Sequence, residues 1–165
     1  FETDSEAQEK AKTKAQEFVG EARGFLILLG DVGLGKSSLA VAVMRETIKR
    51  TTRIRFVTQY EIMEDLRRTY RDKNAKDPVQ TLKGVDLLVL DEMGLSSGGK
   101  DELPAIHSIL NHRHGEGLPT IITANGSAAQ LREDLGDKMS DRISQSVYHV
   151  ANFKGKSKRS QKRIF

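Results

Sequence analysis

The sequence contains no cysteine and no tryptophan, and aromatic residues make up only 5% of its 165 residues. Without cysteine, neither a disulfide framework nor a thiolate metal site can form, which suits a reducing cytoplasm. With few aromatic side chains to stack on bases, any contact with nucleic acid would depend mainly on the phosphate backbone. No apolar run approaches the length of a membrane span, and no signal-peptide pattern occurs. We therefore expect a cytoplasmic protein without a membrane partner.

The length and the charge distribution describe one domain with a basic end. A chain of 165 residues fits a single domain, 1–165, that buries its own core. It begins at Phe1 without a methionine, so we expect a fragment that lacks an N-terminal partner-binding region. Six basic residues and no acidic one lie in 151–165, and without these six the net charge of +4 becomes −2. This basic tail is either a contact for a phosphate backbone or a solvated terminus.

Strand-like and helical segments alternate along the chain. Apolar residues at helical spacing predict helices at 4–19, 36–50, 128–135 and 138–144, others around 62–70 and 103–110, and a short one ending at Leu82. We predict strands at 25–29, 54–58, 85–90, 120–123 and 147–150. The first strand is apolar throughout and the third is apolar apart from Asp86, which is typical of a parallel sheet covered on both faces. The sequence therefore predicts an α/β fold of three layers.

The segment that follows the first strand, GDVGLGKS, matches the phosphate-binding pattern G-x-x-x-x-G-K-[ST]. Its glycines permit a tight turn in which backbone N–H groups approach phosphate oxygens, and the next helix directs its positive N-terminus toward an anion. Lys36 would reach the β- and γ-phosphates, and Ser37 would offer its hydroxyl to Mg²⁺. The alternative is a glycine-rich turn that matches by chance. The predicted nucleotide-binding residues are Gly30, Asp31, Val32, Gly33, Leu34, Gly35, Lys36, Ser37 and Ser38.

Two adjacent carboxylates, Asp91 and Glu92, end the third strand. Ligands of open α/β sheets gather at this carboxyl edge, and a hard cation needs oxygen ligands. Asp91 can therefore hold Mg²⁺ through water, while Glu92 orients or polarises the attacking water. The alternative is that the two acids simply begin a loop. Their position 55 residues after Lys36, and two strands later, favours a pairing with the phosphate loop.

Two further polar residues have less specific patterns. Asn125 follows the fourth strand, where it would lie near the γ-phosphate and the attacking water, although asparagine is also ordinary at a strand-to-helix turn. Arg142 lies on a predicted helix, in the segment LGDKMSDRI. Such an arginine either acts in trans on the nucleotide of a neighbouring subunit or forms a surface ion pair with an acid such as Asp141.

Taken together, GDVGLGKSS, VDLLVLDEMG, PTIITAN and LGDKMSDRI resemble the AAA+ ATPases of the DnaC/DnaI helicase-loader and IstB group. The resemblance covers nearly the whole chain. It implies an AAA+ P-loop NTPase core whose five-stranded parallel sheet has the order 5-1-4-3-2, with Arg142 as the arginine finger of an ATP-dependent oligomer. Only 23 residues follow Arg142, so we expect no full helical lid. The segment NHRH stands where the group tends to have an acid and paired arginines, so the resemblance assigns no role to Arg113.

The resemblance also implies partners. Members of the group load a replicative DnaB-type helicase onto single-stranded DNA or, in the case of IstB, assist a transposase. The group has an extra helix after the second strand that can line a DNA channel, and residues 61–82 are long enough to supply it. The candidate backbone contacts in this segment are Arg67, Arg68, Arg71 and Lys73.

The expected function is ATP binding and hydrolysis with Mg²⁺, coupled to assembly on single-stranded DNA and delivery of a DnaB-type helicase in DNA replication. Its predicted catalytic residues are Lys36, Glu92, Asn125 and Arg142. One alternative is an IstB-type transposition helper that acts with a transposase on duplex DNA. Another is a nucleotide-gated binding module with negligible hydrolysis, against which Glu92 argues because a switch that does not hydrolyse ATP has no need of that acid.

Overall fold

The computed structural model describes residues 6–94 and 102–153, and within them the chain forms five strands joined in one sheet. The strands are β1 (Phe25–Gly30), β2 (Ile54–Thr58), β3 (Leu87–Met93), β4 (Thr120–Ala124) and β5 (Val147–Phe153). Every pairing is parallel, and the order is β2-β3-β4-β1-β5. This confirms the predicted order 5-1-4-3-2, which is the same order counted from the other edge.

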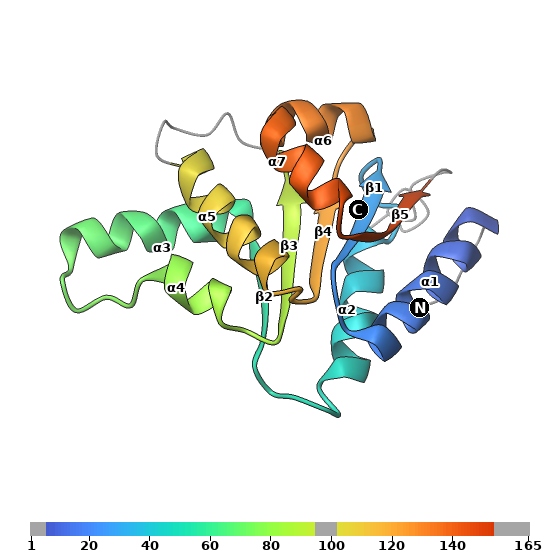
Figure 1. The fold of residues 1–165 in the computed structure, drawn as a ribbon, viewed down its shortest axis with the longest axis horizontal. Coiled ribbons are helices and arrows are strands. Elements are labelled where there is room, and N and C mark those ends of the chain that lie inside the picture. Colours follow the sequence, from blue (N-terminus) through green and yellow to red (C-terminus); the bar gives the residue numbers. More distant parts are fainter. Residues whose placement is uncertain (1–5, 95–101, 154–165) are drawn as a thin grey trace, which may run out of the picture.

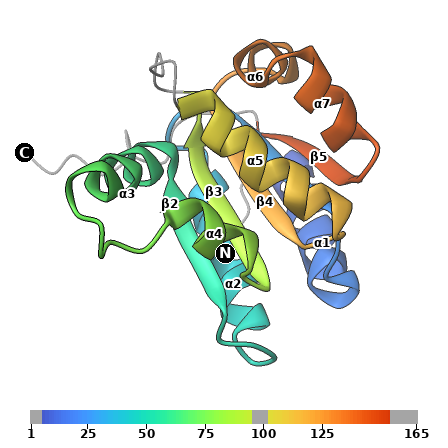
Figure 2. The same ribbon diagram turned by 60° about the vertical axis from the view of Figure 1, so that its left-hand side comes forward.

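Seven helices pack around the sheet in the described part of the chain. They are α1 (Glu6–Glu21), α2 (Lys36–Thr47), α3 (Gln59–Arg71), α4 (Pro78–Lys83), α5 (Glu102–Gly115), α6 (Ala128–Leu135) and α7 (Asp137–Ser144). Figure 1 shows α1 and α2 on one side of the strands and α3, α4 and α5 on the other. The turned view shows α5 lying along the sheet, with α6 and α7 near one end of the strands (Figure 2). The predicted three-layer α/β architecture is confirmed.

Alternating side chains of the central strands build two cores, one on each face of the sheet. Leu28 of β1 and Val89 of β3 pack in the cluster that includes Phe18 of α1, whereas Leu88 packs in the cluster that includes Ile109 of α5. All five side chains are buried. Burying one such side chain contributes about 1.5–3 kcal/mol, so residues 25–29 of β1 and 87–90 of β3 are apolar on both faces.

Local signals set the starts of the helices beside β2. Thr58 and Glu61 form a capping box at the start of α3, in which each side chain accepts a hydrogen bond from the other residue's backbone N–H. Asp77 caps α4 by accepting from Val79 N–H, and Pro78 occupies the first turn, where its missing N–H has no partner to lose. These caps fix the start of α3 directly after β2 and the start of α4 before β3.

The observed elements differ from the predicted ones mainly at their ends. β3 begins at Leu87 and continues through the two carboxylates to Met93, and β5 continues to Phe153. The basic residues of the tail, in 154–163, lie outside the described residues. Tyr70, near the end of α3, is 69% exposed.

The end of the described chain is a strand, not a bundle of helices. After α7, residues 147–153 form β5, which pairs with β1 at the edge of the sheet. Among the residues that the structure describes, no helix combines the length and the apolar character needed to cross a membrane.

Candidate nucleotide site

The phosphate loop joins β1 to α2, and its backbone requires glycine. Gly30 has a φ of 133°, and a Cβ at this position would lie 2.3 Å from the carbonyl oxygen of Phe153 on neighbouring β5. Gly35, the N-cap of α2, has a φ of 94° and supplies no side-chain hydrogen bond to the helix. Because no cap from this residue covers the first turn of α2, its N–H groups can meet an anion in the loop.

Lys36 is only 7% exposed, and its ammonium lies inside this loop. Its Nζ donates to the carbonyl oxygens of Gly30 at 2.6 Å and Asp31 at 2.8 Å, and to Asn125 Oδ1 at 3.0 Å. Asn125 directly follows β4, which neighbours β1 in the sheet. The structure thus brings two of the predicted catalytic residues into direct contact, although they lie 89 positions apart in the chain.

The buried carboxylate of Asp91 is the second centre of the site. Ser37 Oγ lies 2.9 and 3.0 Å from its two oxygens, and Thr123 Oγ1 donates to Oδ1 at 2.5 Å. Asp91 is 6% exposed and Thr123 is 1% exposed. Thr123 was not among the predicted residues. Its only signal in the sequence is its place two residues before Asn125, since alternate residues of a strand share a face.

Glu92 differs from its neighbour in both exposure and backbone. It is exposed, whereas Asp91 and Met93 on either side are buried. Its φ is 57°, a left-handed conformation that is uncommon for a residue other than glycine. Its backbone N–H donates to Thr123 Oγ1 at 3.1 Å. The two adjacent acids therefore occupy different environments at one sheet edge, as two separate chemical roles would require.

Arg142 lies on α7, is exposed, and donates from Nη1 to Asn111 Oδ1 on α5 at 2.5 Å. The nearby ion pairs of Asp141 and Asp137 are made by Arg132 of α6. The hydrogen bond of Arg142 thus goes to a neutral amide, and the side chain of Asn111 does not neutralise the positive charge of Arg142. A role in trans stays a prediction, because a single chain cannot test it.

The four basic residues predicted to contact DNA lie on and just after α3. Arg67, Arg68, Arg71 and Lys73 are all exposed, and Arg68 has a 3.7 Å ion pair with Asp65. Because they are exposed, these side chains are accessible to a large partner, and Figure 1 shows that α3 projects from the side of the sheet. Their role in binding DNA also stays a prediction.

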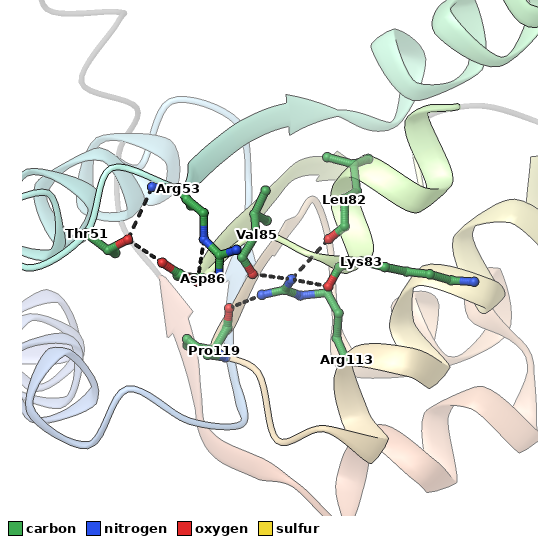
Figure 3. A network of polar contacts seen from close by, with 8 residues as sticks. All are labelled: Thr51, Arg53, Leu82, Lys83, Val85, Asp86, Arg113 and Pro119. Carbon is green, nitrogen blue, oxygen red and sulfur yellow. Dashed lines mark hydrogen bonds and ion pairs between the residues drawn. The ribbon is translucent and has the colours of Figure 1, made fainter. Parts of the chain in front are cut away.

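Arg113 has a place in the structure that no sequence pattern assigned to it. It is fully buried, and its guanidinium donates to the carbonyl oxygens of Val85, Pro119 and Leu82 (Figure 3). It also donates to the hydroxyl of Thr120. Burial lowers the pKa of this guanidinium to about 10, against the opposing effect of the Asp86 charge. Arg113 therefore stays charged at neutral pH, and it ties together the segments where β3 and β4 begin, opposite the nucleotide site.

The family is decided by a comparison that spans the chain. A family model described as IstB-like ATP binding protein matches residues 1–164. The chain belongs to the IstB-like ATP-binding protein family. Membership of this family agrees with the phosphate loop described above, because the family is one of ATP-binding proteins.

The curated relatives of this chain include replicative helicase loaders and proteins of insertion sequences. The replicative helicase loader DnaC of Escherichia coli (strain K12) is 30% identical over 148 residues, which are 87% of this chain and 60% of DnaC. The ATP-binding protein of insertion sequence IS5376 from Geobacillus stearothermophilus is 28% identical over 141 residues, 81% of this chain and 55% of that protein. The chain thus spans little more than half the length of these relatives.

A solved structure confirms the fold. The crystal structure of the DnaC helicase loader matches with a TM-score of 0.82 and 22% sequence identity, covering 93% of this chain and 94% of that one. At this identity the likeness establishes the architecture and not the activity.

Proposed function

We propose that this protein is an ATPase that hydrolyses ATP with Mg²⁺ and couples hydrolysis to assembly on single-stranded DNA and to the delivery of a replicative helicase. The observation that carries the ATPase part is the hydrogen-bonded group at the carboxyl edge of the sheet. In it, Lys36 contacts Asn125, and Ser37 contacts Asp91. Three separate parts of the chain meet there, beside the first turn of α2.

The residues at this edge fit Mg²⁺. Mg²⁺ prefers oxygen ligands and keeps several waters, which suits a hydroxyl and a carboxylate that already lie within 3.0 Å of each other. Ser37 and Asp91 would hold the ion, directly or through water. When bound with ATP, the ion supplies positive charge that offsets the charge of the phosphates. Lys36 would then exchange its carbonyl partners for phosphate oxygens.

Glu92 supports hydrolysis over a binding module without turnover. Its carboxylate is exposed next to the buried Asp91, where it can accept a proton from an attacking water. We expect Glu92→Gln to lower kcat by about 10²–10⁴-fold, the range for a general base, while ATP binding persists. ATP binding by the wild type without phosphate release, even with DNA and partner present, would instead support the module.

A mixing experiment tests the trans role of Arg142. Lys36→Ala, Glu92→Gln and Arg142→Ala are each expected to be inactive, with the loss from Arg142→Ala about 10³–10⁵-fold. In a mixture of Glu92→Gln and Arg142→Ala, one subunit supplies the arginine and the other the glutamate, so activity should return. Arg132→Ala is the matched control, because it removes a neighbouring exposed arginine that already pairs with Asp137 and Asp141. Full activity of Arg142→Ala alone would contradict the assignment.

Assembly on DNA is proposed to use the exposed basic side of α3. Replacing Arg67, Arg68, Arg71 and Lys73 together by alanine removes four positive charges. If each contacts one phosphate, the slope of log K against log salt should fall by about 3 units for single-stranded DNA. The charge-matched control replaces Lys10, Lys12, Lys14 and Lys49, which lie beside the opposite face of the sheet, and should leave that slope unchanged. Equal effects of the two sets would contradict a specific surface.

The choice of partner rests on the relatives. DnaC is named a replicative helicase loader, which supports a helicase as the partner, whereas the IS5376 protein and the family model support a transposase. The affinities for single-stranded and duplex DNA of equal length, measured at one salt concentration, distinguish a helicase partner from a transposase partner. A preference for single strands supports helicase loading in replication, and a preference for duplex supports transposition.

A further inference from the structure

The two carboxylates of the site lie on an irregular part of β3. Leu90 of β3 is opposite Ile122 of β4, and Met93 is opposite Ala124, so β3 advances three residues while β4 advances two. This is a β-bulge, in which one residue is added to one strand. The added residue changes the faces to which the side chains point. Leu90 and Met93, three apart, both pack in the core beside α5, which strict alternation along a strand would forbid.

The bulge is what separates the two acids. Asp91 is the first of the two residues within the irregular step, and it stays buried beside the phosphate loop, on the side of α2. Glu92 takes the left-handed backbone of the bulge and emerges at the surface. In a regular strand this residue would point toward the apolar core that Met93 occupies instead.

One hydroxyl is bonded to both residues of this bulge. Thr123 Oγ1 accepts from the backbone N–H of Glu92 at 3.1 Å and donates to Asp91 Oδ1 at 2.5 Å. It therefore supplies an acceptor to an N–H that the irregular ladder displaces, and it orients the carboxylate that Ser37 also contacts. The side chain of Thr123 is 1% exposed, so water does not compete for these bonds.

We propose that Thr123 is a positioning residue for ATP hydrolysis, whose hydroxyl orients the Asp91 carboxylate toward Ser37 and holds the Glu92 backbone in the bulge that exposes its carboxylate. This inference rests on the ATPase function proposed above. Through Thr123 and Asn125, β4 and the residue after it contact both the phosphate loop and the two acids. Asn125, two residues further along, contacts Lys36, while Thr123 sets the two acids.

The test compares Thr123→Val, which keeps the shape and loses the hydroxyl, with Thr123→Ser, which keeps the hydroxyl. Residues that orient metal ligands typically change affinity or activity by about 10–100-fold. We expect Thr123→Val to lower kcat and to raise the half-saturating Mg²⁺ concentration, each by about 10-fold or more, with KM for ATP much less affected. Thr123→Ser should recover most of both losses. Binding of Mn²⁺ with ATP, followed by electron paramagnetic resonance, should weaken in the valine variant and recover in the serine variant.

Thr120→Val is the matched control, since Thr120 is a buried threonine at the other end of the same strand, where its hydroxyl contacts Arg113. It should reduce thermal stability without changing kcat or the Mg²⁺ dependence of the folded protein. If Thr123→Val does not fold, Thr123→Ala against Thr123→Ser makes the same comparison. Wild-type kcat and Mg²⁺ dependence in the variant without the hydroxyl, or equal losses in both Thr123 variants, would overturn the inference. If the wild type itself hydrolyses no ATP, the proposed function fails, and the Mn²⁺ measurement decides the role of Thr123 by itself.

Discussion

Replacing Arg113 by methionine is expected to destabilise the fold while leaving the nucleotide site intact. Methionine has a comparable length and no hydrogen-bond donor, so the variant isolates the polar contacts of the guanidinium. In the wild type these contacts reach the carbonyl oxygens of Leu82, Val85 and Pro119 and the hydroxyl of Thr120 at 2.7–3.0 Å, and the carbonyl oxygen of Lys83 at 3.3 Å. After the replacement, these acceptors stay in the interior without that donor.

The magnitude follows from two opposing effects. A buried acceptor left without a donor costs about 1–3 kcal/mol. The carbonyl oxygen of Pro119 keeps the N–H of Leu88 as a donor, and the other acceptors oppose the replacement. The wild type, however, already carries the cost of burying a charge, the same burial that lowers the pKa of the guanidinium to about 10. Replacing a buried ionic group by an apolar one can for that reason be neutral. Because the acceptors remain in place here, we expect a net loss of about 2–4 kcal/mol, a large part of the 5–15 kcal/mol typical of a domain.

Urea unfolding followed by circular dichroism measures this loss as a change in the free energy of unfolding. Arg45→Met on α2 is the matched control, because Arg45 is exposed and its replacement should change stability by no more than about 0.5 kcal/mol. ATP affinity of the folded variant should be unchanged, since the network lies where β3 and β4 begin and the nucleotide site lies where they end. An Arg113→Met protein as stable as the wild type, or more stable, would refute the reasoning and show that the burial of charge outweighs the hydrogen bonds.

Three other substitutions test separate parts of the fold. Gly30→Ala should destabilise the protein and abolish ATP binding, because a Cβ at this position would meet a carbonyl oxygen at 2.3 Å. Gly20→Ala has nothing within 4 Å of its Cβ and should stabilise α1 by about 0.5–1 kcal/mol. Thermal unfolding that changes stability in the same direction for both variants would contradict this. Asp86→Asn should lower stability at pH 7 by about 0.5–1 kcal/mol, since hydrogen bonds from Arg53 hold the pKa of this carboxyl below its ordinary value. That contribution to stability is present above about pH 4 and is lost as the pH falls through the lowered pKa. In urea unfolding, the free energies of unfolding of the two proteins should therefore converge in acid. A difference that stays constant as the pH falls would argue against the ion pair. Thr58→Ala should lose about 1 kcal/mol by removing the cap of α3, with Thr58→Ser close to wild type in the same assay.

Much of the fold was predictable because the decisive patterns are local. The apolar runs around Leu28 and Leu88 can be satisfied only by burial on both faces, which requires a covered parallel sheet. The glycine spacing before Lys36 likewise follows from backbone geometry, since Gly30 and Gly35 take positive φ values that other residues rarely adopt. The predicted strand order came from the resemblance and is confirmed.

The sequence by itself determined the layers, the phosphate loop and the pair of acids, because each depends on the identity and spacing of residues close together in the chain. Only the tertiary structure decided which groups Thr123 and Arg113 contact and which backbone conformation Glu92 adopts. A buried hydroxyl or guanidinium is defined by its partners, and these come from strands and helices that are remote in sequence, as Arg113 and Leu82 are at 31 positions apart. The bulge at Glu92 is likewise a property of two strands in register, so no reading of one strand alone could reveal it.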